Sequence, residues 1–330
     1  MVDVTLQEEV MATAEAGMRA RVLDRLRFGD IAFRNITRAA AIAVLLLLSG
    51  VIVSLIQGSL PALRAFGFEF LISDRWNPVT EKFGAIAPVY GTLVTSFIAM
   101  LIAVPVGLMI AFFLTELCPQ WLRRPIGIAI ELLAGIPSII YGIWGLFIFA
   151  PFLQDTLQPF LINTLGNLPG IGALFAGPPY GIGVLTSGLI LAIMVLPFVT
   201  SITRDVFEAV PGVLKEAAYG LGCTRWEVVR NVVLPYARVG VIGGVMLSLG
   251  RALGETMAVT FVIGNAQRYN VSLLAPGQTI SSSLANEFAE ATDQIYSSSL
   301  IALGLVLFVI TFIVLAIARY MLMRIERRIG

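Results

Sequence analysis

The stretch EAAYGLGCTRWEVVRNVVLP, residues 216–235, is a polar interruption between two long apolar runs, residues 181–203 and 239–264. About 20 consecutive apolar residues are enough for a helix to cross a lipid bilayer. The stretch between the two runs is too polar to cross, so we predict that it connects two membrane-spanning helices at the bilayer surface. Pro235 closes the stretch, and we expect it to end the last short helix of this connection.

Two short helices around a turn are expected in this connection. The first covers about residues 212–219, and Gly220 and Gly222 can supply the left-handed residue that ends it. Thr224 is followed three residues later by Glu227, which is the spacing of a capping box at the start of a second helix. A helix–turn–helix can bind DNA, but the flanking membrane spans hold this one at the bilayer. We therefore expect no nucleic-acid partner.

The composition of the whole chain is that of a membrane protein. Hydrophobic residues make up 58% of the 330 residues and charged residues 13%, whereas soluble domains carry about 25% charged residues. Six stretches are long and apolar enough to span the bilayer: residues 39–57, 90–116, 125–150, 181–203, 239–264 and 299–323. The sequence therefore predicts an all-α, polytopic membrane protein. The Gly- and Pro-rich connection at residues 151–179 is expected to be an irregular external loop, partly embedded in the membrane.

The distribution of basic residues predicts the orientation. Of the 22 lysines and arginines, 17 lie in the N-terminal segment, the second and fourth connections and the C-terminal segment. Connections rich in lysine and arginine stay in the cytoplasm. We therefore expect both termini and the polar connection at residues 216–235 to be cytoplasmic.

Two charges remain inside the fifth apolar stretch. Arg251 and Glu255 are four residues apart, so in one continuous helix they share a face, which also carries Ser248. A charge at this depth costs about 2.5–3.5 kcal/mol on insertion scales, so such residues usually face the bundle interior or a wet path. Arg251 is therefore a candidate binding residue for an anion that crosses the membrane, and the alternative is an internal salt bridge. Glu131, in the third stretch, is a weaker candidate, because it could simply lie near the cytoplasmic interface.

Several kinds of chemistry are excluded. The chain has no histidine, and its two cysteines, Cys118 and Cys223, are far apart, so we expect no metal site. A nucleotide-binding P-loop requires a Gly-Lys pair. The only lysines, Lys82 and Lys215, follow Glu81 and Leu214. We therefore expect no cofactor in this chain and no ATPase activity of its own.

The polar connection resembles the EAA loop of ABC importer permeases. That loop has Glu-Ala-Ala, three residues, Gly, nine residues, Ile, one residue and Leu-Pro. The matching positions here are Glu216, Ala217, Ala218, Gly222, Val232, Leu234 and Pro235, with Val232 as the one departure. From about Gly84 to Arg324 the chain is similar to the PstC family, the permease subunits of bacterial phosphate ABC importers, through segments such as IAIELLAGIPSIIYGIWGLFIFAP and GRALGETMAVTFVIGN.

This resemblance implies a type I ABC importer permease fold and four partners or substrates outside the chain. They are a second permease subunit (PstA-like), a dimeric cytoplasmic ATPase (PstB-like) that uses ATP and magnesium, a periplasmic binding protein (PstS-like) and inorganic phosphate. The resemblance also implies that the EAA loop docks on the ATPase and that Arg251 and Glu255 take part in phosphate passage. The chain would lie in the bacterial plasma membrane.

The expected organisation follows from these spans and this resemblance. It consists of a cytoplasmic N-terminal tail (1–38), a first transmembrane helix (39–57), a periplasmic loop (58–89), a core permease domain (90–323) that contains the EAA loop at 208–235, and a cytoplasmic C-terminus (324–330). Two other functions remain open. The chain could be a permease for another oxyanion such as molybdate or sulfate, or an ion-coupled secondary transporter that uses Arg251, Glu255 and Glu131.

Overall fold

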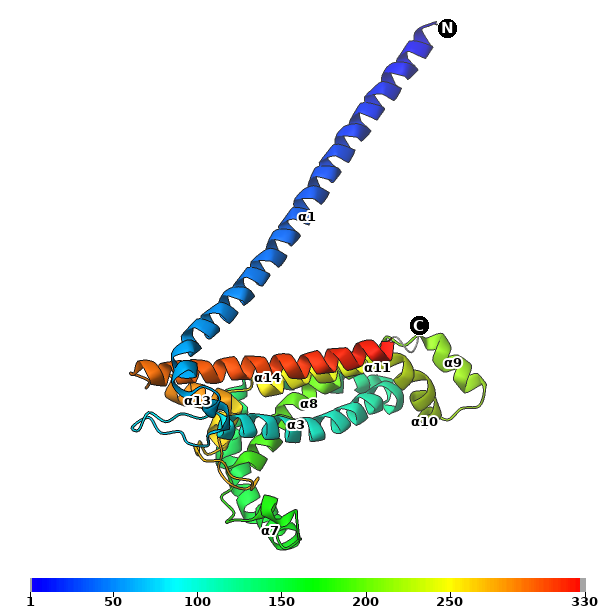
Figure 1. The fold of residues 1–330 in the computed structure, drawn as a ribbon. Coiled ribbons are helices and arrows are strands. Elements are labelled where there is room, and N and C mark those ends of the chain that lie inside the picture. Colours follow the sequence, from blue (N-terminus) through cyan, green and yellow to red (C-terminus); the bar gives the residue numbers. More distant parts are fainter. Residues whose placement is uncertain (1, 327–330) are drawn as a thin grey trace. The chain divides into compact units, whose positions relative to one another are not determined.

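The protein is built from helices joined by irregular connections in the part that the computed structural model describes, which is residues 2–326 for the backbone and 30–324 for side chains. Within those residues the only strand-like pairing is one isolated bridge between Asn77 and Lys82. The chain divides into two compact units, Met1–Gln57 and Gly58–Gly330. Figure 1 shows the helices of the second unit gathered into a bundle.

The first unit consists of the beginning of one long helix, α1 (Val2–Phe66). The part that can span a membrane is Asp30–Phe66. The sequence predicts a polar tail over residues 1–38 followed by a span at 39–57, but no break in the helix separates the two. The apolar side chains of this span, such as Leu45 and Leu47, are exposed within this chain. They therefore fit a surface that is covered by lipid or by another subunit.

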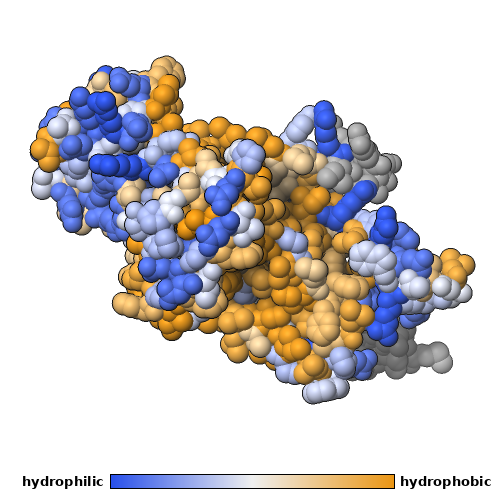
Figure 2. Space-filling model, turned by 90° about the horizontal axis from the view of Figure 1, so that it is seen from below, coloured by the Kyte–Doolittle hydropathy of each residue, from blue (hydrophilic) through white to orange (hydrophobic). Residues whose placement is uncertain are grey.

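Within the described residues, six helical segments are long and apolar enough to cross a membrane, as the sequence predicts. They are Asp30–Phe66, Ile86–Leu117, Ser138–Leu165, Val184–Glu208, Arg225–Leu253 and Gln294–Arg324. Figure 2 shows a broad hydrophobic surface over the bundle, with hydrophilic residues gathered toward its edges. This distribution is that of a protein that crosses a bilayer several times.

The third predicted span, residues 125–150, is wrong in its boundaries. Helix α4 (Gln120–Ala134) ends before Pro137, and the spanning segment begins at Ser138. It runs without interruption through α5 (Ser138–Trp144), η2 (Gly145–Phe149), α6 (Ala150–Phe152), η3 (Leu153–Leu157) and α7 (Gln158–Leu165). Proline disfavours the helical conformation of the residue before it, so the chain breaks there.

The sequence predicted an irregular loop over residues 151–179, and this prediction is wrong for the first part of the connection. Its first part, up to Leu165, completes the third span. Only the part after Leu165 is irregular, apart from the short 3₁₀ helix η4 (Gly172–Phe175). Pro151 does not interrupt the helix, because the wide turn η2, in which the Ala150 N–H donates to the Gly145 carbonyl, directly precedes it.

The fifth span also differs from the prediction of residues 239–264. It begins earlier, with α10 (Arg225–Val228) and η5 (Val229–Val233), and continues as α11 (Leu234–Leu253). Pro235 does not end the helix. A wide turn in which the Leu234 N–H donates to the Val229 carbonyl precedes the proline, so the chain passes it within the helix. After Leu253 the chain breaks and then forms α12 (Met257–Val262).

The centre of the bundle is formed by α3 (Ile86–Phe112), which continues into η1 (Phe113–Leu117), and α8 (Val184–Glu208). Helix α11 packs against α8 through glycines. A Cβ at Gly240 would lie 2.6 Å from Val206, and one at Gly244 would lie 2.6 Å from Ile202. Small residues permit such close approach of membrane helices. The glycine face of α11 thus faces α8.

Helices α2 (Glu69–Ile72) and α13 (Ile280–Glu287) close one end of the bundle together with the first turn of α14 (Gln294–Glu326). The buried carboxylate of Glu287 accepts hydrogen bonds from Trp76 Nε1 at 2.6 Å and Tyr296 Oη at 2.8 Å, and also from the amides of Gln267 and Gln278. One side chain therefore holds two loops and two helices together.

Candidate functional site

A groove of about 760 Å³ runs between α8, α11 and α14. Most of its lining is apolar, including Phe198, Ile202 and Leu247. Its polar lining consists of Ser248, Arg251, Thr311 and Arg319. Hydroxyl and guanidinium groups donate hydrogen bonds, so the polar part of this groove suits an anion.

Arg251 lies in the last turn of α11, with its side chain exposed to the groove. The guanidinium carbon stands 4.2 Å from the centroid of the Phe198 ring, a cation–π contact. Among the side chains that the structure describes, no ion pair joins Arg251 to Glu255. This arrangement contradicts the alternative of an internal salt bridge between these two residues. The aromatic contact leaves the positive charge without a counter-ion.

Ser248 lies one turn before Arg251 and lines the same groove. Its side chain is 1% exposed, and its hydroxyl has no hydrogen-bond partner within the described part of the chain. A buried hydroxyl without a partner costs free energy. The sequence predicted that Ser248 and Arg251 would share a face, and the structure brings both to one groove.

Glu255 is not on the same helix as Arg251, so the prediction that both share one helix face is wrong. Helix α11 ends at Leu253, and Glu255 lies in the break at residues 254–256. Its Oε1 accepts a hydrogen bond from the N–H of Ala258 at 3.3 Å, at the start of α12. Glycine has low helix propensity, and a carboxylate stabilises the first turn of a helix, so Gly254 and Glu255 together favour a new helix start.

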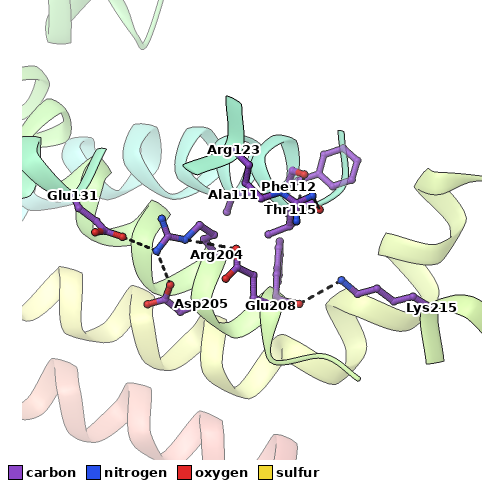
Figure 3. Close-up of polar contacts among 10 residues, drawn as sticks. Ala111, Phe112, Thr115, Arg123, Glu131, Arg204, Asp205, Glu208 and Lys215 are labelled. Carbon is purple, nitrogen blue, oxygen red and sulfur yellow. Dashed lines mark hydrogen bonds and ion pairs between the residues drawn. The ribbon is translucent and has the colours of Figure 1, made fainter. Parts of the chain in front are cut away.

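Glu131 lies apart from the groove. It belongs to α4, is about half exposed, and pairs with Arg204 through a 2.6 Å contact. Arg204 also pairs with Asp205 at 2.9 Å and approaches Glu208 at 4.0 Å. Figure 3 shows these three carboxylates around the one guanidinium. This pairing favours the interpretation that Glu131 lies near the cytoplasmic interface, since Arg204 belongs to a connection predicted to be cytoplasmic.

The polar connection has the local structure predicted for it. Helix α9 covers Gly212–Gly220, and Gly222 has a φ of +85°, as a left-handed helix stop requires. Thr224 and Glu227 form both hydrogen bonds of a capping box at the start of α10. Gly220 is part of α9 and does not supply the left-handed residue.

The EAA residues divide into an exposed group and a buried group. Glu216, Ala217, Gly222 and Pro235 are exposed. Ala218 is buried among Phe207, Val228 and Val233, and Leu234 packs on the edge of the same cluster. The buried residues thus fix the loop to the bundle, while the exposed ones are free to contact another protein.

The outer surface of the loop is apolar at its most exposed points. Val213 is 74% exposed, Leu221 is 86% exposed and Trp226 is 58% exposed. Apolar side chains this exposed on a polar loop are candidates for contact with another protein. The sequence analysis did not single out these residues, although their apolar character inside a polar stretch is visible in it.

Comparison with known proteins identifies the family. The family model described as binding-protein-dependent transport system inner membrane component matches residues 103–327. A Mesorhizobium japonicum protein named phosphate transport system permease protein PstC is 68% identical over 312 residues, covering 94% of this chain and 95% of that protein. A Pasteurella multocida protein of the same name is 58% identical over 301 residues, covering 91% of this chain and 94% of that protein. The chain belongs to the PstC family.

The PstC-family chain has the fold of an ABC importer permease, as predicted. A permease chain of a bacterial alginate ABC importer superposes with a TM-score of 0.54 at 15% identity, covering 88% of this chain and 98% of that one. A chain of the MetNI methionine ABC transporter, in an inward-facing conformation, superposes with a TM-score of 0.53 at 16% identity, covering 78% and 100%. At these identities the likeness shows the fold alone.

Four side chains of this PstC-family chain carry contacts that sequence reasoning missed: Phe198, Arg204, Glu116 and Lys215. Phe198 is one of many aromatic residues in apolar runs, and nothing in the sequence distinguishes it. Arg204 lies 73 residues from its partner Glu131, and Lys215 lies 99 residues from its partner Glu116. A possible signal for Lys215 is that it is one of only two lysines in the chain and directly precedes Glu216.

Proposed function

We propose that this chain is the membrane-spanning permease subunit of an ATP-driven importer of inorganic phosphate. The observation that carries the proposal is the unpaired guanidinium of Arg251 in the groove, next to the partner-free hydroxyl of Ser248. A guanidinium stays charged at any physiological pH and binds tetrahedral oxyanions through paired N–H donors. The name of the 68% identical relative, phosphate transport system permease protein PstC, supports phosphate as that oxyanion.

The energy for transport would come from another subunit. This chain has no Gly-Lys pair and so no P-loop of its own. The match of residues 216–235 to the EAA loop, together with the exposed Val213, Leu221 and Trp226, supports docking of this loop on a dimeric, PstB-like ATPase that binds ATP and magnesium. We call the exposed and buried parts of this connection, residues 208–235, the coupling loop.

The complete transporter would contain two further proteins. A second, PstA-like permease would complete the membrane path, and a periplasmic, PstS-like protein would deliver phosphate from outside. Both termini and the coupling loop would face the cytoplasm, since 17 of the 22 basic residues lie in those segments. The groove side of α11 would then be the part of this subunit that the anion meets.

The mechanism would be alternating access. ATP-driven closure of the ATPase would move α9, and the buried Ala218, Val228 and Val233 would carry that movement into the bundle. Arg251 would bind the phosphate oxygens while the groove is open to one side and release them to the other. Glu255, at the break beyond α11, would accept a hydrogen bond from a protonated phosphate oxygen.

Uptake by reconstituted vesicles tests the proposal. Vesicles containing all subunits, with ATP, the binding protein and radiolabelled phosphate, would be compared for wild type, Arg251→Gln and Arg64→Gln. Arg64 is an exposed arginine in the last turn of α1 and serves as the control. We expect Arg251→Gln to eliminate uptake while the complex still assembles, and Arg64→Gln to leave uptake unchanged.

Two outcomes would contradict the proposal. Survival of uptake in Arg251→Gln would remove Arg251 from the required path, and loss of assembly would give it a structural role instead. Unlabelled molybdate and sulfate would be added as competitors to the wild-type vesicles. Stronger competition by either anion than by unlabelled phosphate would assign this permease to a different oxyanion.

A further inference from the structure

A partly buried ion pair joins the coupling loop to the end of α3. Lys215 Nζ, on α9, lies 2.7 Å from Glu116 Oε1, in η1. The side chain of Glu116 is 8% exposed and that of Lys215 is 19% exposed. Figure 3 shows the Lys215 contact beside the cluster around Arg204. Helix α9 is therefore bound by charge, as well as by apolar packing, to the helix at the centre of the bundle.

The same ammonium group reaches a second helix. Lys215 Nζ also donates to the carbonyl oxygen of Phe207, near the end of α8, at 3.5 Å. On the other side of the turn, Arg225 donates to the carbonyl oxygen of Glu116 at 3.5 Å. Two basic residues of the coupling loop thus hold Glu116, in the η1 turn that follows α3. The ends of the two central helices, α3 and α8, meet at one lysine.

Glu116 lies at a position where a movement of α9 would be passed on to the helices of the bundle. It belongs to η1 (Phe113–Leu117), where the wide helical turn departs from the regular ladder of hydrogen bonds. Such turns occur often at functional positions. The chain then turns at Cys118 and Pro119 into α4. A pull on Glu116 would therefore act on the junction between α3 and α4.

An ion pair with little solvent exposure is harder to separate than an ion pair on the protein surface. Exposed pairs are screened by water and contribute little. Removal of one partner from a buried pair is strongly unfavourable, because the remaining charge has no counter-ion. The Lys215–Glu116 pair therefore resists separation when α9 is displaced, whereas apolar side chains can slide past one another.

We propose that the ion pair between Lys215 and Glu116 transmits the movement of α9 to α3 and α8, so that ATP hydrolysis drives phosphate transport. Both are positioning residues that contact neither ATP nor phosphate. The inference rests on the proposed function, in which the coupling loop docks on the ATPase. It adds a specific path from that dock to the centre of the bundle.

The experiment measures phosphate transported per ATP hydrolysed in vesicles that contain the complete transporter. The variants are Lys215→Met, Glu116→Gln and the exchanged pair Lys215→Glu with Glu116→Lys. The control is Lys82→Met, which changes the only other lysine, in the loop between α2 and α3. We expect each single variant to bind the ATPase and hydrolyse ATP, but to transport about tenfold less phosphate per ATP, within the usual range of coupling between sites.

The exchanged pair and a conservative variant separate a coupling role from a structural one. The exchanged pair restores opposite charges and should recover most of the phosphate transported per ATP. Lys215→Arg keeps the positive charge and should retain the wild-type ratio of phosphate to ATP. An unchanged ratio in both single variants would overturn the proposal. So would loss of the ATPase from both purified single-variant complexes without recovery in the exchanged pair, because that result would assign the pair to assembly.

A separate variant distinguishes failure of this inference from failure of the proposed function. Glu216→Lys changes the exposed carboxylate next to Lys215 and should release the ATPase from the complex. Retention of the ATPase and of full transport in Glu216→Lys would contradict docking through the coupling loop. Release of the ATPase in Glu216→Lys, with normal coupling in Lys215→Met and Glu116→Gln, would contradict the ion-pair inference alone.

Discussion

The guanidinium of Arg251 lies over the ring of Phe198, 4.2 Å from its centroid, and Glu255 lies beyond the end of the same helix. The aromatic ring orients the side chain without neutralising it. A carboxylate in the same position would compete with any anion for the guanidinium donors. The helix break after Leu253 therefore decides how Arg251 is held, and it leaves the charge available to a substrate.

Replacement of Phe198 tests this orientation. Phe198→Leu keeps the apolar lining of the groove and removes the aromatic face. Cation–π contacts contribute about 0.5–2 kcal/mol, so we expect the maximal rate of phosphate uptake in vesicles to fall roughly threefold to thirtyfold. Phe198→Tyr keeps the ring and is the matched control. Equal rates for the leucine and tyrosine variants would show that the ring does not position Arg251.

Glu255→Gln separates the charge of this residue from its hydrogen bond. The amide oxygen can still accept from the N–H of Ala258, so we expect the purified complex to keep its thermal unfolding temperature. Uptake should fall strongly, because a neutral amide is a weaker acceptor than a carboxylate for a protonated phosphate oxygen. The measurements are phosphate uptake and thermal unfolding of the same preparation. A lowered unfolding temperature with normal uptake would limit Glu255 to starting α12.

Two neighbouring glycines of the coupling loop offer a matched pair of substitutions. Gly222 has a φ of +85°, where a side chain is strained, whereas Gly220 is helical, and neither has an atom within 4 Å of a Cβ built on it. A non-glycine residue in the left-handed region costs about 1–2 kcal/mol. We expect Gly222→Ala to reduce co-purification of the ATPase and phosphate uptake, and Gly220→Ala to leave both unchanged.

One result for these two glycine variants would contradict the prediction. Similar co-purification and uptake for Gly222→Ala and Gly220→Ala would show that the left-handed turn is not needed for docking. The amount of permease in the membrane is measured in both variants, so a defect in insertion is recognised separately.

Local patterns in the sequence predicted the parts of the structure that depend on local chemistry. Six spans follow from the length of apolar runs, and the capping box of Thr224 and Glu227 follows from hydrogen bonds within three residues. The breaks before Ser138 and after Leu253 were missed because apolar residues continue on both sides, although Pro137 and the pair Gly254 and Glu255 mark these positions in the sequence. Gly142 of α5 lies against Met257 and Ala258 of α12, and this packing between distant segments stabilises both short helices.

The sequence predicted which residues belong to the candidate site, but not how they are arranged in space. Ser248 and Arg251 line one groove because they are one turn apart on a regular helix. Glu131 could be separated from them only with the structure, since its partner Arg204 comes from another helix. Contacts between residues so far apart in sequence are set by tertiary packing, which a single sequence does not reveal. The roles of these residues in transport stay predictions.

The continuity of the helix from Arg225 to Leu253 has a mechanical consequence. Its 29 residues rise about 1.5 Å each, so the segment is about 40 Å long and reaches from the coupling loop to Arg251. Because the wide turn before Pro235 keeps this segment in one piece, it can act as a lever across most of the bilayer. A tilt of about 5° at the cytoplasmic end would move the far end by about 4 Å at that length. That displacement exceeds the length of a hydrogen bond. A small rotation at the membrane surface is therefore enough to bring the Arg251 guanidinium into or out of contact with a bound anion.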